Sequence, residues 1–299
     1  MKLGTLPAAE LRARLGRGLV LKTGPFRIQV ASRTEEVFQG LHRLYDEFEF
    51  HDDGFVDYFV RVDRVRGPRG HWRPQVSFWF DGMEPFKPLP ADHAFASLEW
   101  GLNWCIAGHA HYYLSLHAAA LERNGRAVIL PGDPGAGKST LTAALALSGF
   151  RLLSDEMSLI DRADGLLVPL ARPVNLKNDS IAIIAAFRPE AVFGPTAHET
   201  HKGTVAHLKP PVDSVRRMDE KARPAFLVFP RWQAGAPARL TPRPRADAFM
   251  HAATHAFSYE LLGPLGYELN AALIDGCECF DFTYSKLDDA IAVFEDLLR

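Results

Sequence analysis

Cysteine, net charge and long apolar runs are all scarce in this sequence. Its 299 residues include three cysteines, Cys105, Cys277 and Cys279, too few for a disulfide framework. Lys and Arg total 34 against 36 for Asp and Glu, a net charge of −2, so a broad basic surface for nucleic acid is not expected. No run of about 18 apolar residues occurs, and the N-terminus lacks the apolar region of a signal peptide. We therefore expect a cytoplasmic protein with no membrane span and no nucleic-acid partner.

The overall composition is that of a folded globular protein. Hydrophobic residues make up 47% of the chain and charged residues 23%, which argues against disorder. A chain of this length can bury a large core without disulfides. At about 100–200 residues per domain, it corresponds to one large or two modest domains.

The first hundred residues have the patterns of a separate α+β module. Alternating apolar and polar residues predict three strands, at 18–30, 55–65 and 75–80. Helix-like spacing of apolar residues predicts a helix over 32–48. A proline-rich stretch at 85–90 precedes a further predicted helix at 93–106. We therefore divide the chain into an N-terminal α+β recognition module, residues 1–100, and a second domain, residues 101–299.

The second domain alternates predicted strands and helices, which is typical of the α/β class. Apolar runs predict strands at 115–121, 126–130, 150–154 and 225–229. Helical spacing predicts helices at 139–147, 246–259 and 286–298. Gly and Pro are frequent over 193–211, and this segment is predicted to be turn-rich.

A glycine-rich loop is predicted between one of these strands and the helix that follows it. Residues 132–139 read GDPGAGKS, which satisfies the phosphate-loop pattern G-x-x-x-x-G-K-[ST]. The glycines allow backbone N–H groups to point at phosphate oxygens, Lys138 can reach the β- and γ-phosphates, and the Ser139 hydroxyl can ligate Mg²⁺. We therefore expect ATP with Mg²⁺ as the bound ligand. The expected nucleotide-binding residues are Gly132, Asp133, Pro134, Gly135, Ala136, Gly137, Lys138, Ser139 and Thr140.

Two acidic residues, Asp155 and Glu156, follow the next predicted strand. A carboxylate at a strand end beside a phosphate loop can bind Mg²⁺, directly or through water. It can equally accept the proton of an attacking hydroxyl group. The alternative is that the two residues only open a turn.

The stretch from 117 to 160 resembles the catalytic core of the bacterial HPr serine kinase/phosphorylases, whose nucleotide-binding fold is related to that of phosphoenolpyruvate carboxykinase. In that family a histidine lies before the loop, the loop reads GDSGxGKS, and an apolar strand ends in paired aspartates. His117, the GDPGAGKS loop and the Asp155–Glu156 pair match these features in order. The resemblance implies that Asp155 is the base for a substrate serine, that Glu156 assists the metal, and that His117 lies near the transferred phosphate.

This sequence departs from the family pattern at several points. Pro134 and Thr140 differ from the usual loop, and Glu156 replaces the second aspartate with a longer side chain. The family's downstream signature segment has no counterpart. The chain is therefore more similar to the HPr-kinase-related proteins of the "HprK-related kinase A" type, which share the catalytic half and carry a different N-terminal module. The resemblance implies a serine kinase for a protein or peptide other than HPr, and it leaves a homo-oligomer open.

Other residues give weaker signals. Lys177 and Lys202 lie on turn-rich segments after the loop. Lys202 or a neighbour is a candidate to contact the γ-phosphate or the acceptor, and a solvated surface loop is the alternative. His251 and His255 share a helix face, but zinc needs further ligands and no H-E-x-x-H motif is present, so packing or a surface role is expected. The C-x-C cysteines of residues 277–279 are expected to be buried.

Three functions are compatible with these residues. The expected one is an ATP-dependent serine kinase for a protein or peptide, with Lys138 and Mg²⁺ bearing the phosphate charge and Asp155 as base. The alternatives are a phosphate-loop ATPase or nucleotide switch that binds a partner through its N-terminal module, and a kinase for a small molecule.

Overall fold

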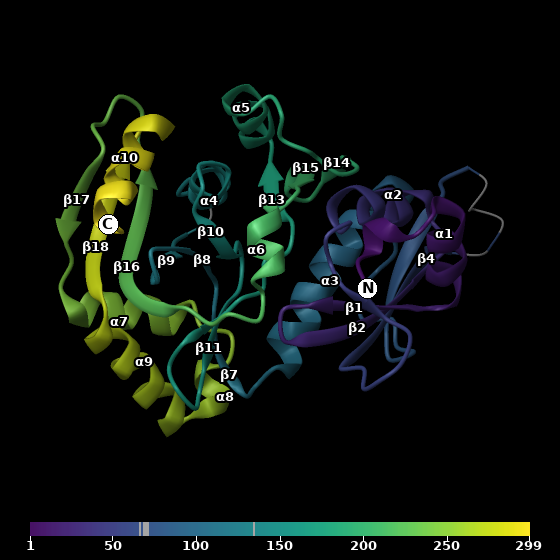
Figure 1. Ribbon diagram of the computed structural model, residues 1–299, viewed down its shortest axis with the longest axis horizontal. Helices are drawn as coiled ribbons and strands as arrows, with labels where there is room; N and C mark the ends of the chain where they lie inside the picture. Colours follow the sequence, from purple (N-terminus) through teal and green to yellow (C-terminus); the bar gives the residue numbers. More distant parts are fainter. Residues whose placement is uncertain (66, 68–71, 134) are drawn as a thin grey trace.

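The computed structural model describes residues 1–65, 67, 72–133 and 135–299. The chain is a mixed α/β protein, and its described part contains two six-stranded and two three-stranded sheets. Figure 1 shows the two large sheets side by side, with the N-terminal one on the right. In the described ranges, no helix is both long and apolar enough to cross a membrane.

The N-terminal sheet has the strand order β3-β1-β2-β4-β5-β6. Its strands are β1 (Leu19–Thr23), β2 (Phe26–Ser32), β3 (Phe50–His51), β4 (Tyr58–Arg64), β5 (Gln75–Phe80) and β6 (Leu89–Pro90). Strands β2 and β4 are parallel, and their crossover contains α2 (Glu35–Leu44). The single alternating run at 18–30 is in fact the hairpin β1–β2, because Gly24 adopts a φ of 58° and turns the chain. A second helix, α1 (Ala8–Arg17), packs against β2.

Helix α3 (Ala94–His109) completes the core of the N-terminal module. It packs against β4 and β5, and the apolar side chains of Phe95, Leu98 and Leu102 are buried with those of the sheet. The division expected at residue 100 falls inside this helix. We therefore propose that the module extends through α3 to His109.

The second large sheet has the order β10-β8-β9-β16-β18-β17. Its strands are β8 (Ala118–Arg123), β9 (Arg126–Pro131), β10 (Arg151–Ser154), β16 (Arg223–Trp232), β17 (Arg239–Pro242) and β18 (Glu278–Tyr284). Strands β9, β16 and β18 are mutually parallel. Helices α4 (Lys138–Leu147) and α10 (Leu287–Leu297) share one apolar core with the sheet. Helices α7 (Arg245–Thr254) and α9 (Pro264–Gly276) share a second one, so helices cover both faces.

The predicted strand at 115–121 is two strands that belong to different sheets. Strand β7 (Tyr113–Leu116) pairs with β11 (Ser158–Asp161), which also pairs with β12 (Leu167–Val168). The chain bends at His117 before β8 begins. The predicted helix at 246–259 is likewise divided into α7 and the short α8 (Tyr259–Leu262).

The segment predicted as turn-rich, 193–211, forms a β-hairpin instead. Strands β14 (Ala197–Thr200) and β15 (Gly203–Leu208) join β13 (Val174–Lys177) in a three-stranded sheet. Val205, Ala206 and Leu208 are buried, and this apolar contribution outweighs the turn residues at the two ends of the segment. In the chain, helix α5 (Asp179–Phe187) lies between β13 and β14, and the short helix α6 (Val212–Arg216) follows β15.

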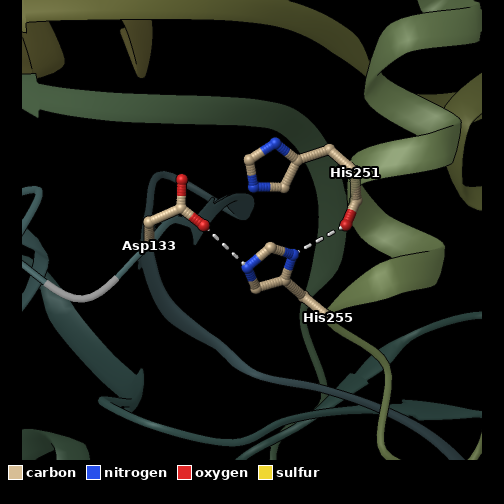
Figure 2. A group of neighbouring side chains, drawn as sticks. All are labelled: Asp133, His251 and His255. Atoms are coloured by element: carbon tan, nitrogen blue, oxygen red, sulfur yellow. Dashed lines mark hydrogen bonds and ion pairs between the residues drawn. The ribbon is translucent and has the colours of Figure 1, made fainter.

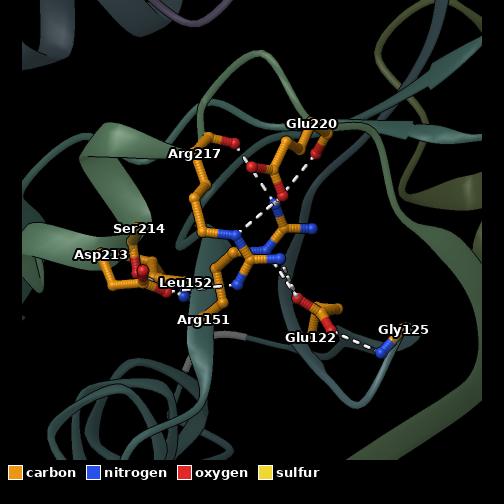
Figure 3. Close-up of polar contacts among 8 residues, drawn as sticks. All are labelled: Glu122, Gly125, Arg151, Leu152, Asp213, Ser214, Arg217 and Glu220. Carbon is orange, nitrogen blue, oxygen red and sulfur yellow. Dashed lines mark hydrogen bonds and ion pairs between the residues drawn. The ribbon is translucent and has the colours of Figure 1, made fainter.

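A buried ion pair and several further polar contacts lie at β10, the edge strand of this sheet (Figure 3). The Arg151 Nε lies 2.6 Å from the Glu122 Oε2, and the two side chains are 4% and 6% exposed. Glu122 also accepts a hydrogen bond from the Gly125 N–H at 2.7 Å. The Leu152 N–H donates to the Ser214 Oγ at 2.8 Å instead of to another strand. Ser214 thus satisfies one backbone N–H at the outer edge of β10, the strand that leads directly to Asp155.

Candidate active site

The loop between β9 and α4 borders a cleft of about 820 Å³. Most of the residues predicted from the sequence line this cleft together: His117, Gly132, Asp133, Gly135, Gly137, Lys138, Ser139, Thr140, Glu156, Lys177 and Lys202. Pro134 lies outside the described residues. Ala136 and Asp155 do not line the cleft. The Ala136 carbonyl accepts a hydrogen bond from the Trp232 N–H at 3.0 Å, and Asp155 lies in a small adjoining polar cavity.

Two glycines allow the conformation of the loop, and residues at the ends of two strands hydrogen-bond to its backbone. Gly135 and Gly137 have φ values of 87° and 86°, which favour glycine over other residues. The Tyr284 hydroxyl donates to the Gly137 carbonyl at 3.0 Å. A Cβ atom on Gly137 would lie only 2.6 Å from the Tyr284 Oη. The ends of β16 and β18, where Trp232 and Tyr284 lie, therefore fix the loop and leave its other side open to the cleft.

Lys138 places a buried positive charge beside this loop. The residue is 9% exposed, and its Nζ has no hydrogen-bond partner within the described part of the chain. Burial lowers the pKa of Lys138, while the charges of Asp155 and Glu156 oppose that shift. A buried ammonium group without a partner is costly. An anionic ligand in the cleft would relieve this cost, as a phosphate group does.

Asp155 and Glu156 lie next to each other in the chain but differ in electrostatic character. The Asp155 Oδ2 accepts a hydrogen bond from the Asn175 N–H at 2.9 Å. Burial and the neighbouring charge of Glu156 raise the pKa of Asp155 to about 7. Burial also disfavours the charged form of Glu156, but Lys177 and Lys202 outweigh it and hold the pKa of Glu156 below its usual range. Glu156 is therefore ionised at neutral pH, and Asp155 is the carboxylate suited to gain and lose a proton near neutrality.

His117 lies at the bend between β7 and β8 and lines the same cleft. Its ring packs edge-on against Phe257, with centroids 5.5 Å apart. Burial and the nearby charge of Lys138 lower the pKa of His117 to about 4. The imidazole is thus neutral at physiological pH, when it can donate one hydrogen bond and accept another.

Helix α3 of the N-terminal module supplies residues that the sequence did not indicate. Asn103, Trp104 and Ala107 line the cleft. The Asn103 Nδ2 donates to the Glu156 Oε2 at 2.5 Å, and Arg172 donates to the Asn103 Oδ1. The predicted helix at 93–106 contains these residues, but its apolar spacing indicates only packing. A side chain that lines a cleft formed with distant segments leaves no local signal in the sequence.

Lys202 lies in the turn of the β14–β15 hairpin, not in an open loop. Its Nζ is 5.6 Å from the centroid of the Trp100 ring on α3. Lys177 ends β13 on the same sheet. Lys177 therefore ends a strand of this sheet, Lys202 lies in its hairpin turn, and both line the cleft.

The two helical histidines have a neighbour that the sequence did not predict. The ligand atoms of Asp133, His251 and His255 all lie within 4.8 Å of one another. The expectation of a packing or surface role for the histidines omitted this carboxylate, because Asp133 is 122 positions from His255 in the chain. Cys277 and Cys279 are buried in the core beneath α7 and α9, as expected.

No protein-family model matches this chain, and no curated protein matches it. Among solved structures it is similar to the Hpr(Ser) kinase/phosphatase from Coxiella burnetii, at 12% sequence identity and a TM-score of 0.26. The match covers 61% of this chain and 96% of that one. A similarity of this size does not establish a shared nucleotide-binding fold or a shared activity, so any function has to be argued from the cleft.

Proposed function

We propose that this chain is an ATP-dependent kinase that transfers the γ-phosphoryl group of Mg-ATP to a serine hydroxyl of a protein or peptide. The observation that carries the proposal is the buried ammonium group of Lys138, which has no hydrogen-bond partner among the residues that the structure describes. It lies where a glycine-rich loop borders one cleft with the carboxylate of Glu156. A site with these groups can bind phosphate oxygens and a divalent cation at once.

In this proposal the loop N–H groups and Lys138 bind the phosphates of ATP. The Ser139 hydroxyl and the ionised Glu156 carboxylate are oxygen donors of the kind that Mg²⁺ prefers. Bound Mg²⁺ would neutralise charge on the β- and γ-phosphates. Lys202 would add a positive charge on the opposite side of the transferred group.

Asp155 would act as the general base. As the acceptor hydroxyl oxygen forms its bond to the γ-phosphorus, Asp155 takes the hydroxyl proton, and the bond from the γ-phosphorus to the bridging oxygen of ADP breaks. A carboxylate with a pKa of about 7 is matched to this role near neutral pH. Asp155 Oδ1 accepts no hydrogen bond from the described residues, which leaves that oxygen available for a proton. His117, neutral and in the same cleft, can hydrogen-bond the transferred phosphoryl group.

The acceptor would bind against the apolar part of the cleft. Trp104 and Ala107 from α3 and Phe257 from the second domain line it. Aromatic and small apolar side chains of this kind suit a peptide segment next to the reacting hydroxyl. We therefore assign acceptor recognition to the N-terminal module through α3.

The test is incubation of the purified protein with γ-labelled ATP and Mg²⁺, with and without cell extract, followed by separation by size. We expect label on a protein or peptide band. Asp155→Asn should still bind a fluorescent ATP analogue but lose transfer by about 10²- to 10⁴-fold, whereas Lys138→Ala should lose nucleotide binding. The matched control is Asp164→Asn, which changes an exposed aspartate paired with Lys221 outside the cleft.

The same experiment separates the alternatives. Near-normal transfer by Asp155→Asn would show that another group is the base. Label recovered only as inorganic phosphate would indicate an ATPase or nucleotide switch. Label on a small molecule from the extract would indicate a small-molecule kinase.

A further inference from the structure

We propose that Asp133, His251 and His255 form a binding site for one transition-metal ion, Zn²⁺ in particular, at the edge of the cleft. The three side chains converge from two distant segments (Figure 2). Their ligand atoms all lie within 4.8 Å of one another. This site is separate from the Mg²⁺ site assigned to Ser139 and Glu156, and it does not depend on the proposed phosphoryl transfer.

The two histidines are arranged as ligands of one ion. They lie four positions apart at the end of α7, with ring centroids 4.4 Å apart and an interplanar angle of 17°. The His255 Nε2 is 3.1 Å from the Asp133 Oδ1. Two ligands on a tetrahedral zinc ion, each bound at about 2.0–2.1 Å, are about 3.3 Å apart. The Asp133–His255 pair thus already has the spacing of one tetrahedral edge.

In His255, the contact of the ring nitrogen that faces away from Asp133 favours metal binding at the other ring nitrogen. The His255 Nδ1 lies 2.9 Å from the His251 carbonyl oxygen. It donates its hydrogen there, which leaves the lone pair of Nε2 directed at Asp133, the arrangement typical of metal-binding histidines. The His251 Nε2 is buried and has no partner among the residues described here. Figure 2 shows it facing the Asp133 carboxylate and the His255 ring.

Arg243 brings one positive charge next to the site, and a neighbouring carboxylate balances it. Its Nη2 lies 3.5 Å from the His251 Nδ1, so metal binding at Nε2 requires this long contact to open and the His251 proton to move to Nδ1. The Arg243 guanidinium is paired with Asp281 at 2.7 Å. The Asp133 carboxylate, 72% exposed, is able to adjust to an arriving ion.

The ligand chemistry selects the ion. Imidazole nitrogen suits Zn²⁺, Cu²⁺ and Ni²⁺, whereas Mg²⁺ and Ca²⁺ prefer oxygen donors. Two imidazoles and one carboxylate leave a fourth tetrahedral position for water or a ligand oxygen. Because Asp133 also lines the cleft, the ion would lie at the edge of the cleft proposed for the nucleotide. An ion bound here would link the start of the glycine-rich loop to the C-terminal end of α7.

The experiment is a Zn²⁺ titration of metal-stripped protein against a chromogenic chelator, with Co²⁺ as a spectroscopic probe. We expect one Zn²⁺ per chain and the strong visible absorption of four-coordinate Co²⁺. Single replacements His251→Ala, His255→Ala and Asp133→Asn should each weaken Zn²⁺ binding by about tenfold or more. The matched control is His198→Ala, which removes an exposed histidine on β14 far from this cluster in the chain.

Each outcome bears on the site. Loss of binding in the three variants but not in the control supports it. Asp133→Asn keeps the test valid if a histidine variant unfolds, because this side chain is largely exposed and its replacement leaves α7 unchanged. Retention of one tightly bound Zn²⁺ in all three variants, or failure of the unmodified protein to bind Zn²⁺, would overturn the proposal.

Discussion

The buried pair between Glu122 and Arg151 gives a stability prediction that can be worked out from its contacts. Glu122→Gln removes the negative charge 2.6 Å from the Arg151 Nε, while an amide oxygen can still accept from the Gly125 N–H. Breaking a buried pair on one side costs about 3–5 kcal/mol, because the remaining charge stays buried without a counter-ion. Arg151 keeps two carbonyl partners, those of Arg217 and Glu220, at 3.2 and 3.0 Å, and the Glu220 Oε2 remains 3.7 Å from its Nη1. We therefore expect Glu122→Gln to lower the free energy of unfolding by about 3 kcal/mol, the lower end of this range.

The chain offers a matched control next to this pair. Arg123 and Glu295 form an ion pair of similar length, 2.8 Å, but their side chains are 34% and 44% exposed. Exposed pairs contribute about 0–1 kcal/mol. Glu295→Gln should therefore cost less than about 1 kcal/mol, although the chemical change is the same.

The assay is urea unfolding followed by far-ultraviolet circular dichroism, in which the midpoint and slope give the free energy of unfolding. The double variant Glu122→Leu/Arg151→Met should recover most of the loss, because apolar side chains replace both buried charges. If Glu122→Gln costs no more than Glu295→Gln, the electrostatic account of the β10 edge is wrong. Equal losses in the single and double variants would point to packing instead.

Three further predictions concern the cleft and its surroundings. Gly137→Ala brings a Cβ to 2.6 Å from the Tyr284 Oη, so the loop must shift; we expect about tenfold weaker binding of a fluorescent ATP analogue, and unchanged affinity would contradict this. Asn103→Ala removes the 2.5 Å hydrogen bond to Glu156; the Mg²⁺ concentration for half-maximal transfer should rise about tenfold, while an unaltered Mg²⁺ curve would show that Asn103 does not position this carboxylate. Burial lowers the pKa of His207 to about 3, so the unfolded chain binds more protons there and stability falls as pH drops below about 6.5. At pH 5 this one group should cost about 2 kcal/mol, and urea midpoints from pH 8 to 5 should fall less steeply in His207→Leu.

Local sequence was sufficient for the glycine-rich loop and its two flanking elements. The motif, the strand before it and the helix after it are contiguous, so spacing alone indicates their order. The same reasoning predicted strand β5 at its observed bounds, because its apolar run is short and flanked by turn residues. These features depend on residues a few positions apart.

The hairpin β14–β15 shows where such reasoning fails. Gly194, Pro195, Pro210 and Pro211 suggested turns throughout, but they only flank two short strands. The strands exist because Leu208 packs in a core contributed by distant segments and Val205 is buried as well. Tertiary burial overrides local propensity there.

The composition of the site could be predicted only in part for the same reason. His117, Lys138 and Glu156 belong to one continuous stretch, and the cleft brings them together. Asn103 and Trp104 come from the N-terminal module, and Asp133 meets His255 across 122 positions. Lys177 and Lys202 determine which of the two buried carboxylates stays charged. The positions of these lysines depend on the pairing of β13 with β15, which the motif does not reveal.

Helix α3 is part of the N-terminal core and also of the cleft lining, and this limits where the chain can be shortened. One side of it is buried with the N-terminal sheet through Leu98 and Leu102, and Asn103 and Trp104 reach into the cleft. A shortened chain that began at α3 would expose the apolar side to water, whereas one that began after α3 would lose part of the cleft lining. The chain therefore cannot be cut at either end of α3 without loss of buried packing or of part of the cleft lining.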